Sequence, residues 1–292
     1  LQSVIADVCK NFAFLENSEK TNDADKKIFH NLMYEQGSES NIESWLKVLT
    51  RMLFMHYEKP VILFIDEYDV PVSNAQEHGF YTDMISVIRN MLSIALKTNE
   101  FLKFAVITGC LCIAKESIFT GVNHFVSYSV LDEPFSDSFG FTENEVKQLL
   151  ADAGLKEKLP EIKTWYDGYR FGSSELYCPW DVVNYVKDLL YDQNQPPKNY
   201  WVHTSHNGML KNFIDHNEWN LHDKFETLLN GGCLQQTITD EVTYDQLQIS
   251  EDYLWSILFM TGYLTKANKD HTGQTLIKIP NKEISQIFEQ AV

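Results

Sequence analysis

Apolar residues recur at helical spacing through the first 58 positions of the chain. They form two groups: Ile5, Val8, Phe12 and Leu15, and then Ile42, Trp45, Leu46, Leu49, Met52 and Leu53. This spacing predicts two amphipathic helices within a mainly helical segment. The polar stretch 16–25 is predicted to be a loop, Ser40 or Asn41 to cap the second helix, and Pro60 to end it.

A continuous apolar run at residues 61–65 follows this helical segment. Such a run is typical of a strand that is covered on both faces. Residues 68–71 are predicted to be a loop, residues 80–96 an amphipathic helix, and residues 104–107 a second buried strand. A strand, a helix of this length and a second strand form a βαβ unit, so we expect the two strands to be parallel. Residues 125–131 alternate in polarity and are a candidate third strand.

Shorter helices are predicted from residue 142 onward. Their ranges are 142–153, 159–165, 179–190, 207–217, 253–264 and 281–291. Thr142 and Glu145 have the spacing of a capping box, which marks a helix start. Residues 264–266 and 275–279 are predicted to pair as a hairpin. Helices followed by a hairpin indicate a winged-helix-like end.

Polar residues with a chemical role follow both predicted strands of the βαβ unit. Asp66 and Glu67 come directly after the first strand, and Thr108 directly after the second. Ligands of open α/β sheets bind at the carboxyl ends of the strands. In this Walker B pattern Asp66 holds Mg²⁺, Glu67 orients or deprotonates the attacking water, and Thr108 senses the γ-phosphate of ATP. Two strands that simply end in solvated polar residues are the alternative, and the pattern leaves both open.

The pattern G-x-x-x-x-G-K-[S/T] is absent from the 292 residues. That loop supplies the backbone N–H groups and the lysine that hold the phosphates of a nucleotide. We therefore expect Mg²⁺ and ATP to bind only to a full-length protein that supplies the loop, and this chain alone to be inactive. The predicted fold is α/β: a partial P-loop NTPase-type parallel sheet followed by a mainly α-helical region. Residues 1–141 are the predicted core without its phosphate loop, and residues 142–292 a helical lid with the winged-helix-like module.

Composition and charge restrict the partners that we expect. Hydrophobic residues make up 44% and charged residues 22%, as in a soluble globular protein. Every apolar run is too short to cross a membrane, so we expect no membrane contact. The formal net charge of −17 argues against a broad nucleic-acid-binding surface, although it leaves room for a local basic patch. Five cysteines without a CxxC pair and the lack of a leader before the fold favour a reduced, cytoplasmic location.

Three further groups have both a chemical and a structural interpretation. Cys110 and Cys112 could contribute to a metal site or be ordinary buried thiols, and His203 and His206 could bind metal or be polar loop residues. Residues 165–172 (WYDGYRFG) could stack on a base, but packing between helices is the favoured interpretation.

Several motifs occur in the order found in a known family, the bacterial AAA-ATPase-like proteins that often carry a C-terminal PD-(D/E)XK nuclease-like domain. They are FIDEYDVP at 64–71, LKFAVITGCLCIAKESIFTG at 102–121, FGFT at 139–142, WYDGYRFG at 165–172, PW at 179–180, YW at 200–201, TS at 204–205 with Asn207, residues 250–264, and IPNKE at 279–283. The chain resembles this family from about residue 61 to its last residue.

This resemblance implies a P-loop fold whose phosphate loop precedes residue 1, with a nuclease-like domain after residue 292. Three residues depart from the family pattern: Cys112 stands where Arg is usual, and Cys178 and His203 stand where Asn is usual. Loss of an arginine near the sensor strand would weaken charge stabilisation at a nucleotide.

Three functions follow as hypotheses. The first is an ATP-binding or ATP-hydrolysing module. The second is a degenerate, non-catalytic module that binds a protein partner through its helical half. The third is the ATPase part of a nuclease-linked effector, for which the sequence leaves nucleic-acid binding open.

Overall fold

The computed structural model describes residues 1–111, 125–201, 221–240, 242, 250–267 and 274–291. The contacts within the chain divide it into two compact units, residues 1–126 with 241–245, and residues 127–240 with 246–292. Both α-helices and small sheets are present, which confirms a mixed α/β protein. The predicted helix 207–217 lies outside the described residues. The predicted division into a core (residues 1–141) and a lid region (residues 142–292) stays a prediction.

Three α-helices and a 3-10 turn form the helical start of the first unit. They are α1 (Gln2–Asn11), η1 (Ala13–Asn17), α2 (Asp23–Met33) and α3 (Glu39–Tyr57). Their apolar faces meet in one core that contains Ile5, Cys9, Leu15, Phe29, Leu32, Val48, Leu49 and Met52. The sequence analysis predicted a loop as far as residue 25, whereas α2 already begins at Asp23. Asn22 explains the early start, because its side chain accepts the backbone N–H of Asp25 and caps the helix.

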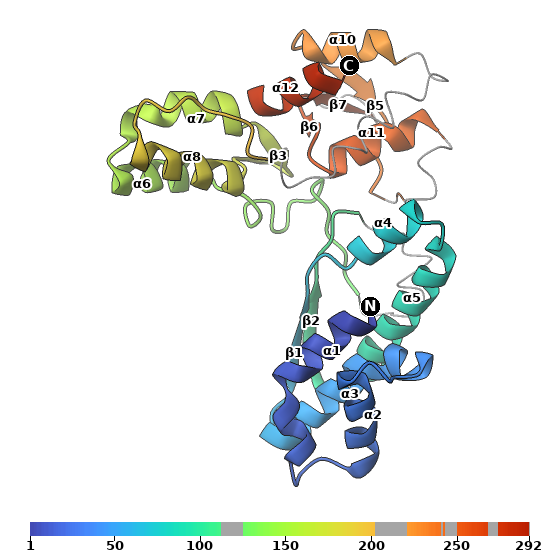
Figure 1. Cartoon of the computed structure of the whole chain (residues 1–292). Helices are drawn as coiled ribbons and strands as arrows, with labels where there is room; N and C mark the ends of the chain where they lie inside the picture. Colours follow the sequence, from blue (N-terminus) through green and yellow to red (C-terminus); the bar gives the residue numbers. More distant parts are fainter. Residues whose placement is uncertain (112–124, 202–220, 241, 243–249, 268–273, 292) are drawn as a thin grey trace. The chain divides into compact units, whose positions relative to one another are not determined.

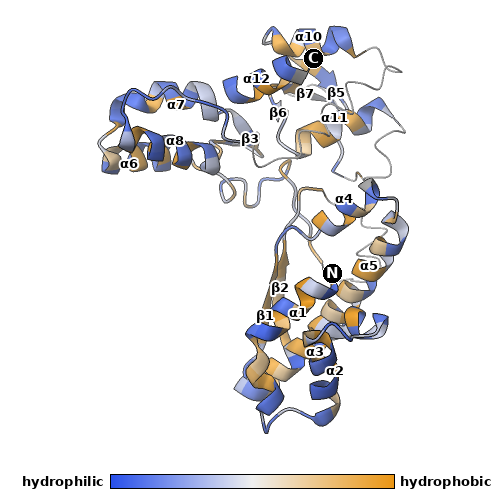
Figure 2. Ribbon diagram, in the orientation of Figure 1, coloured by the Kyte–Doolittle hydropathy of each residue, from blue (hydrophilic) through white to orange (hydrophobic). Residues whose placement is uncertain are grey.

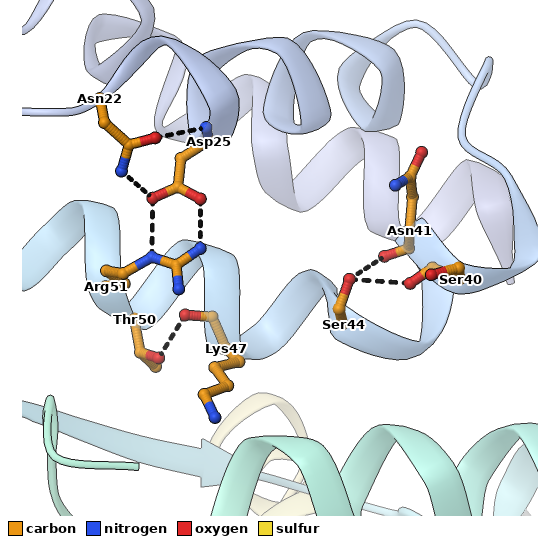
Figure 3. Close-up of polar contacts among 8 residues, drawn as sticks. All are labelled: Asn22, Asp25, Ser40, Asn41, Ser44, Lys47, Thr50 and Arg51. Carbon is orange, nitrogen blue, oxygen red and sulfur yellow. Dashed lines mark hydrogen bonds and ion pairs between the residues drawn. The ribbon is translucent and has the colours of Figure 1, made fainter.

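A buried ion pair joins α2 to α3 (Figure 3). The side chain of Asp25 is 3% exposed and accepts two hydrogen bonds from the guanidinium group of Arg51, one of them 2.7 Å long. The side-chain amide of Asn22 donates a third hydrogen bond to the same carboxylate at 2.6 Å. The carboxylate therefore has a bidentate cationic partner and an amide donor, as a buried charge requires.

Strands β1 (Val61–Ile65) and β2 (Leu102–Ile107) form the predicted parallel pair, with Ile65 opposite Ile107 (Figure 1). Helix α5 (Tyr81–Leu96) connects them and packs on α3, which confirms the predicted βαβ unit. The predicted loop at 68–71 is wrong in its second half, because helix α4 (Val70–Glu77) begins there. Pro71 lies in the first turn of α4, where its missing N–H needs no partner.

Strands β1 and β2 are largely hydrophobic in the hydropathy colouring (Figure 2), and one face of their sheet is open to solvent. Phe64 is 72% exposed, and Ile62, Phe104 and Val106 are each exposed by more than 40%. The continuous apolar run of β1 predicted a strand covered on both faces. That prediction is wrong for the described residues, because β1 alternates between half-buried and exposed positions and only one face packs on helices such as α3.

The second unit begins with a helical part that closes on a small hairpin. It contains α6 (Glu143–Ala153), η3 (Lys156–Lys158), α7 (Leu159–Tyr166), β3 (Tyr169–Phe171), β4 (Ser174–Leu176) and α8 (Pro179–Tyr191). The predicted capping box of α6 is present, with both the Thr142 and the Glu145 hydrogen bonds formed. The candidate strand at 125–131 is wrong, because these residues form irregular structure and a turn. The side chain of Asp132 accepts hydrogen bonds from the backbone and the hydroxyl of Ser129 and so favours that turn.

The second unit ends with helices and a three-stranded antiparallel sheet. The elements are α10 (His222–Leu229), β5 (Leu234–Gln236), α11 (Glu251–Met260), β6 (Thr265–Lys266), β7 (Thr275–Lys278) and α12 (Lys282–Ala291). The strand order is β5-β7-β6. The predicted hairpin is confirmed as β6 and β7, and β5 is an additional strand that the sequence analysis missed. None of the helices in the described ranges combines the length and the apolarity needed to span a membrane.

Candidate functional site

Asp66 and Thr108 lie next to each other at the carboxyl ends of β1 and β2. The parallel ladder continues one residue beyond the strands, because the backbone N–H of Thr108 donates to the carbonyl of Ile65 at 2.9 Å. The hydroxyl of Thr108 donates a hydrogen bond to the carboxylate of Asp66. The structure thus brings together two residues that are 42 positions apart in the sequence.

A turn held by Tyr68 and Asp69 fixes the backbone that follows Thr108. The buried carboxylate of Asp69 accepts the backbone N–H groups of Cys110 at 3.1 Å and Leu111 at 3.0 Å. The hydroxyl of Tyr68 donates to the carbonyl of Leu111 at 2.9 Å. These contacts connect the loop after β1 to the loop after β2, so Asp69 and Tyr68 determine where Thr108 stands.

The side chains of Tyr68 and Asp69 pack so closely against position 109 that only glycine fits there. A Cβ atom at position 109 would lie 2.6 Å from both the Asp69 carboxylate and the Tyr68 ring. Contacts this short do not occur between real atoms, so any larger residue would displace the turn. No role was predicted for Asp69 or Gly109 from the sequence. The available signal was an acid three residues after Asp66, opposite a glycine that directly follows Thr108.

Glu67 is exposed and adopts an uncommon backbone conformation. Its φ angle is 51°, in the left-handed region that non-glycine residues rarely occupy. The chain turns sharply here, since the backbone N–H of Val70 donates to the carbonyl of Glu67 at 3.1 Å. Such outliers cluster at functional sites, where the surrounding structure maintains the strain.

Three carboxylates make the site electronegative. Desolvation, together with the negative charges of Asp69, Glu67 and Asp66, raises the pKa of the Cys110 thiol to about 11. The same charges would repel a nucleotide unless cations compensate them. Across the described residues, no group of three or more His, Cys, Asp or Glu side chains could hold a metal ion by itself.

The donor atoms nevertheless fit Mg²⁺ bound together with a nucleotide. This ion prefers oxygen ligands, keeps several waters, and is usually held by one or two carboxylates plus phosphates rather than by a cage of side chains. Asp66 is exposed at the sheet edge and presents a carboxylate, and Thr108 orients it. The assigned roles of Asp66, Glu67 and Thr108 remain predictions.

The structure adds little evidence for a chemical role of the other candidate residues. Cys112, His203 and His206 lie outside the described residues, so the metal sites suggested for them stay predictions. Tyr166, from the aromatic motif 165–172, is fully buried in the helical core of the second unit. Its ring packs at a tilt against Tyr185 with a centroid separation of 5.7 Å, which favours the packing interpretation for this residue.

Comparison with known proteins supports the family resemblance. Residues 3–119 match the model of a family described as Predicted AAA-ATPase. The chain is also 24% identical over 241 residues to an uncharacterized protein from the vnfD 5′ region of Azotobacter chroococcum mcd 1. That alignment covers 80% of this chain but only 42% of the relative's length. No solved structure matches the chain.

Proposed function

We propose that the chain is part of an ATP-binding, ATPase-like module, with Asp66 and Glu67 as its Walker B acids and Thr108 as its sensor residue. The observation that carries this proposal is the hydrogen bond between Thr108 and Asp66 at the carboxyl ends of two parallel strands. The match of residues 3–119 to the Predicted AAA-ATPase family supports it independently.

Each residue has a separate role in this proposal. Asp66 would hold Mg²⁺, mainly through water, while Thr108 keeps the Asp66 carboxylate oriented and, as the sensor residue, would respond to the γ-phosphate. Glu67 orients the attacking water or accepts its proton. When bound, Mg²⁺ neutralises charge on the phosphates. Asp69 and Tyr68 keep Thr108 in place by fixing the backbone at Cys110 and Leu111.

The proposal includes a phosphate loop supplied from outside these 292 residues, as part of a P-loop-type sheet. The open apolar face of β1 and β2 supports this, because parallel strands normally have both faces covered. The greater length of the Azotobacter relative is in agreement. In this arrangement residues 1–141 are the core and residues 142–292 the lid with its end module.

We further propose that the end of the second unit is winged-helix-like. The support is its element order, in which one strand lies between two helices and a hairpin follows, with the first strand pairing beside the second strand of the hairpin. Winged-helix modules commonly bind nucleic acid or protein. Association with a nuclease-like domain, as in a nuclease-linked effector, rests on the family resemblance alone.

Phosphate release by the longer protein tests the assigned roles. Loss of the Glu67 carboxylate in Glu67→Gln should slow steady-state ATP hydrolysis by about 10²–10⁴-fold, the range of general acid–base catalysis. Thr108→Val, which keeps the shape but removes the hydroxyl, should also lower the rate. Asp83→Asn, an exposed change on α5, is the matched control and should leave the rate unchanged. Residues 1–292 alone should release no phosphate, and hydrolysis by them that Glu67→Gln abolishes would overturn the requirement for an external phosphate loop.

A non-catalytic module that binds a protein partner is the second candidate. The open apolar face around Phe64 favours it, since exposed apolar patches often mark interaction sites. Cys112 in place of the arginine usual in the family agrees with it as well. The two candidates differ in whether the longer protein binds nucleotide, because an interaction module has no need of it.

A further inference from the structure

Two acidic residues of the second unit are buried against each other. Asp181 lies in the first turn of α8 and Glu283 in the first turn of α12, and neither side chain is exposed. The two carboxyl groups are close enough to interact electrostatically. Two ionised carboxylates can only accept hydrogen bonds and repel each other, so this closeness is favourable only when one of the two buried groups carries a proton.

Few donors are available to stabilise a second negative charge here. One oxygen of Glu283 accepts the backbone N–H groups of Tyr200 at 2.6 Å and Trp201 at 3.0 Å. The other Glu283 oxygen and both Asp181 oxygens find no hydrogen-bond donor in the described part of the chain. The Tyr200 and Trp201 amides and the N-terminal ends of α8 and α12 can stabilise a single negative charge. They are too few to stabilise two negative charges.

Three lysines on or beside the surrounding elements are engaged elsewhere, and Lys187 on α8 is exposed. Lys198 pairs with Asp188 at 2.6 Å, Lys163 pairs with Glu143 at 2.6 Å, and Lys282 lies over the ring of Trp165. The titratable groups that do face the acid pair are Cys178 beside Asp181, Tyr166 at the end of α7, Tyr169 on β3, and Tyr200. A tyrosine or thiol cannot neutralise a carboxylate, so the pair has no counter-charge among these groups.

The electrostatic surroundings agree with this geometry. Burial and the neighbouring Asp181 charge raise the pKa of Glu283 to about 8. Burial also raises the pKa of Asp181 above its usual value. Two like charges in one buried site cannot both ionise at neutral pH, so the pair titrates as a unit.

The same place joins several of the sequence motifs. The side-chain amide of Asn281 donates to the carbonyl of Asp167 at 2.9 Å, and a Cβ on Gly168 would lie 2.2 Å from the carbonyl oxygen of Pro280. The backbone N–H groups of Tyr200 and Trp201 bind Glu283, and the indole N–H of Trp180 donates to the carbonyl of Tyr200 at 3.4 Å. Four motifs therefore meet around the acid pair: WYDGYRFG at 165–172, PW at 179–180, YW at 200–201 and IPNKE at 279–283. These contacts connect the helical part of the second unit to α12.

We propose that Asp181 and Glu283 share one proton and act as a proton-dependent latch between α8 and α12, which loosens when the second carboxyl group ionises. The latch is a conformational device within the second unit and does not depend on the nucleotide site. It gives the four motif segments a common role, which is to assemble and close this junction.

The direction of the pH effect follows from the proton count. In the unfolded chain both acids lose their protons near their ordinary pKa values, whereas the folded pair keeps one proton up to about pH 8. Between about pH 4.5 and about pH 8 the folded state therefore binds more protons than the unfolded state. The stability of the folded state falls as pH rises through this range. Above about pH 8 the shared proton no longer stabilises the fold, and the acid pair no longer makes stability depend on pH.

Chemical denaturation of the whole chain at pH 6, 7.5 and 9 tests the latch. The wild-type midpoint should decrease across this series. Glu283→Gln should remove most of the decrease, because glutamine is neutral at every pH and its amide can donate to Asp181. Glu289→Gln, an exposed acid on the same helix, is the matched control and should behave like the wild type.

Two spectroscopic measurements on the wild type keep the test decisive if Glu283→Gln does not fold. Infrared spectra should show the carbonyl stretch of a protonated carboxyl at pH 7 and lose it above pH 9. Amide exchange at Tyr200 and Trp201, corrected for the intrinsic effect of pH, should accelerate over the same range. A wild-type midpoint that stays constant or rises from pH 6 to 9, or the lack of a protonated carboxyl at pH 7, would overturn the proposal.

Discussion

At the scale of single residues, the backbone of Glu67 shows how the proposed site is strained. A left-handed conformation costs a non-glycine residue about 1–2 kcal/mol, because its Cβ crowds the following carbonyl. Glu67 keeps this conformation between the end of β1 and the fixed turn at Tyr68 and Asp69. A residue with a Cβ at this position therefore lowers stability, which agrees with the proposed catalytic role of Glu67.

This strain predicts that Glu67→Gly stabilises the first unit by about 0.5–1 kcal/mol. Relief of the strain outweighs the additional entropy of a glycine in the unfolded chain, which is about 0.5–1 kcal/mol. Glu67→Ala is the matched control, since alanine also lacks the carboxylate but keeps the Cβ, and it should give no such gain. Urea denaturation of the two variants and the wild type measures the difference. Equal stabilities of the glycine and alanine variants would contradict the interpretation.

The sequence indicated part of this residue-level arrangement. Asp66, Glu67 and Thr108 could be picked out because acids or a hydroxyl directly after buried strands meet at one sheet edge. Asp69 was missed, because its role depends on hydrogen bonds to the backbone of residues 41 and 42 positions later, and its spacing from Asp66 is only a weak signal. Likewise, the pairing of Asp181 with Glu283 joins two helix starts that no local pattern connects.

At the scale of elements, the ion pair between Asp25 and Arg51 determines how α2 stands on α3. The Asp25 carboxylate is buried, so removing its cationic partner would leave a charge without compensation. Loss of one partner of a buried pair typically costs about 3–5 kcal/mol, whereas exposed pairs contribute about 0–1 kcal/mol.

We therefore expect Arg51→Met to destabilise the first unit by about 3 kcal/mol, because methionine keeps the apolar stem and removes the charge. Lys10→Met, which removes the exposed pair with Asp7 on α1, is the control and should cost less than about 1 kcal/mol. The double variant Asp25→Leu with Arg51→Met should recover much of the loss. Denaturation midpoints of the wild type and the three variants measure these changes in stability. Similar losses of stability for Arg51→Met and Lys10→Met would show that the ion pair between Asp25 and Arg51 is not a stabilising buried pair.

Elements with a strong local signal were predicted well from the sequence. The spacing of apolar residues identified α5, and the capping box identified the start of α6. Helix α4 was missed because its first turn contains Pro71, and β5 was missed because it has only three residues. The candidate strand at 125–131 failed because alternating polarity alone does not supply a neighbouring strand with which to pair.

At the scale of the whole molecule, the open face of the β1–β2 sheet is the feature with the largest consequence. The continuous apolar run predicted strand β1 correctly but did not predict that one of its faces is open. The residues that cover a strand lie elsewhere in the sequence, so the strand's own pattern does not reveal them. Phe64, Phe104 and their neighbours remain exposed in the described chain. Exposed apolar faces and open strand edges favour association.

Residues 1–292 should therefore self-associate in solution, and Phe64→Lys should reduce this association. The substitution should change stability by less than about 0.5 kcal/mol, because the Phe64 side chain is 72% exposed. Tyr191→Lys, at a position 94% exposed on α8, provides a matched control that should leave association unchanged. Sedimentation velocity over a range of concentrations measures the effect. A wild-type chain that stays monomeric throughout would be evidence against it.

Calorimetric titration of Mg²⁺-ATP into a protein that joins this chain to the proposed phosphate loop tests whether Asp66 belongs to an ATP site. We predict Mg²⁺-dependent binding that Asp66→Ala weakens at least about tenfold, equivalent to about 1.4 kcal/mol. Glu67→Gln should retain binding, and Asp83→Asn on α5 should match the wild type. Absence of Mg²⁺-ATP binding by the wild type, or equal affinities of the wild type and Asp66→Ala, would show that Asp66 is not part of an ATP site.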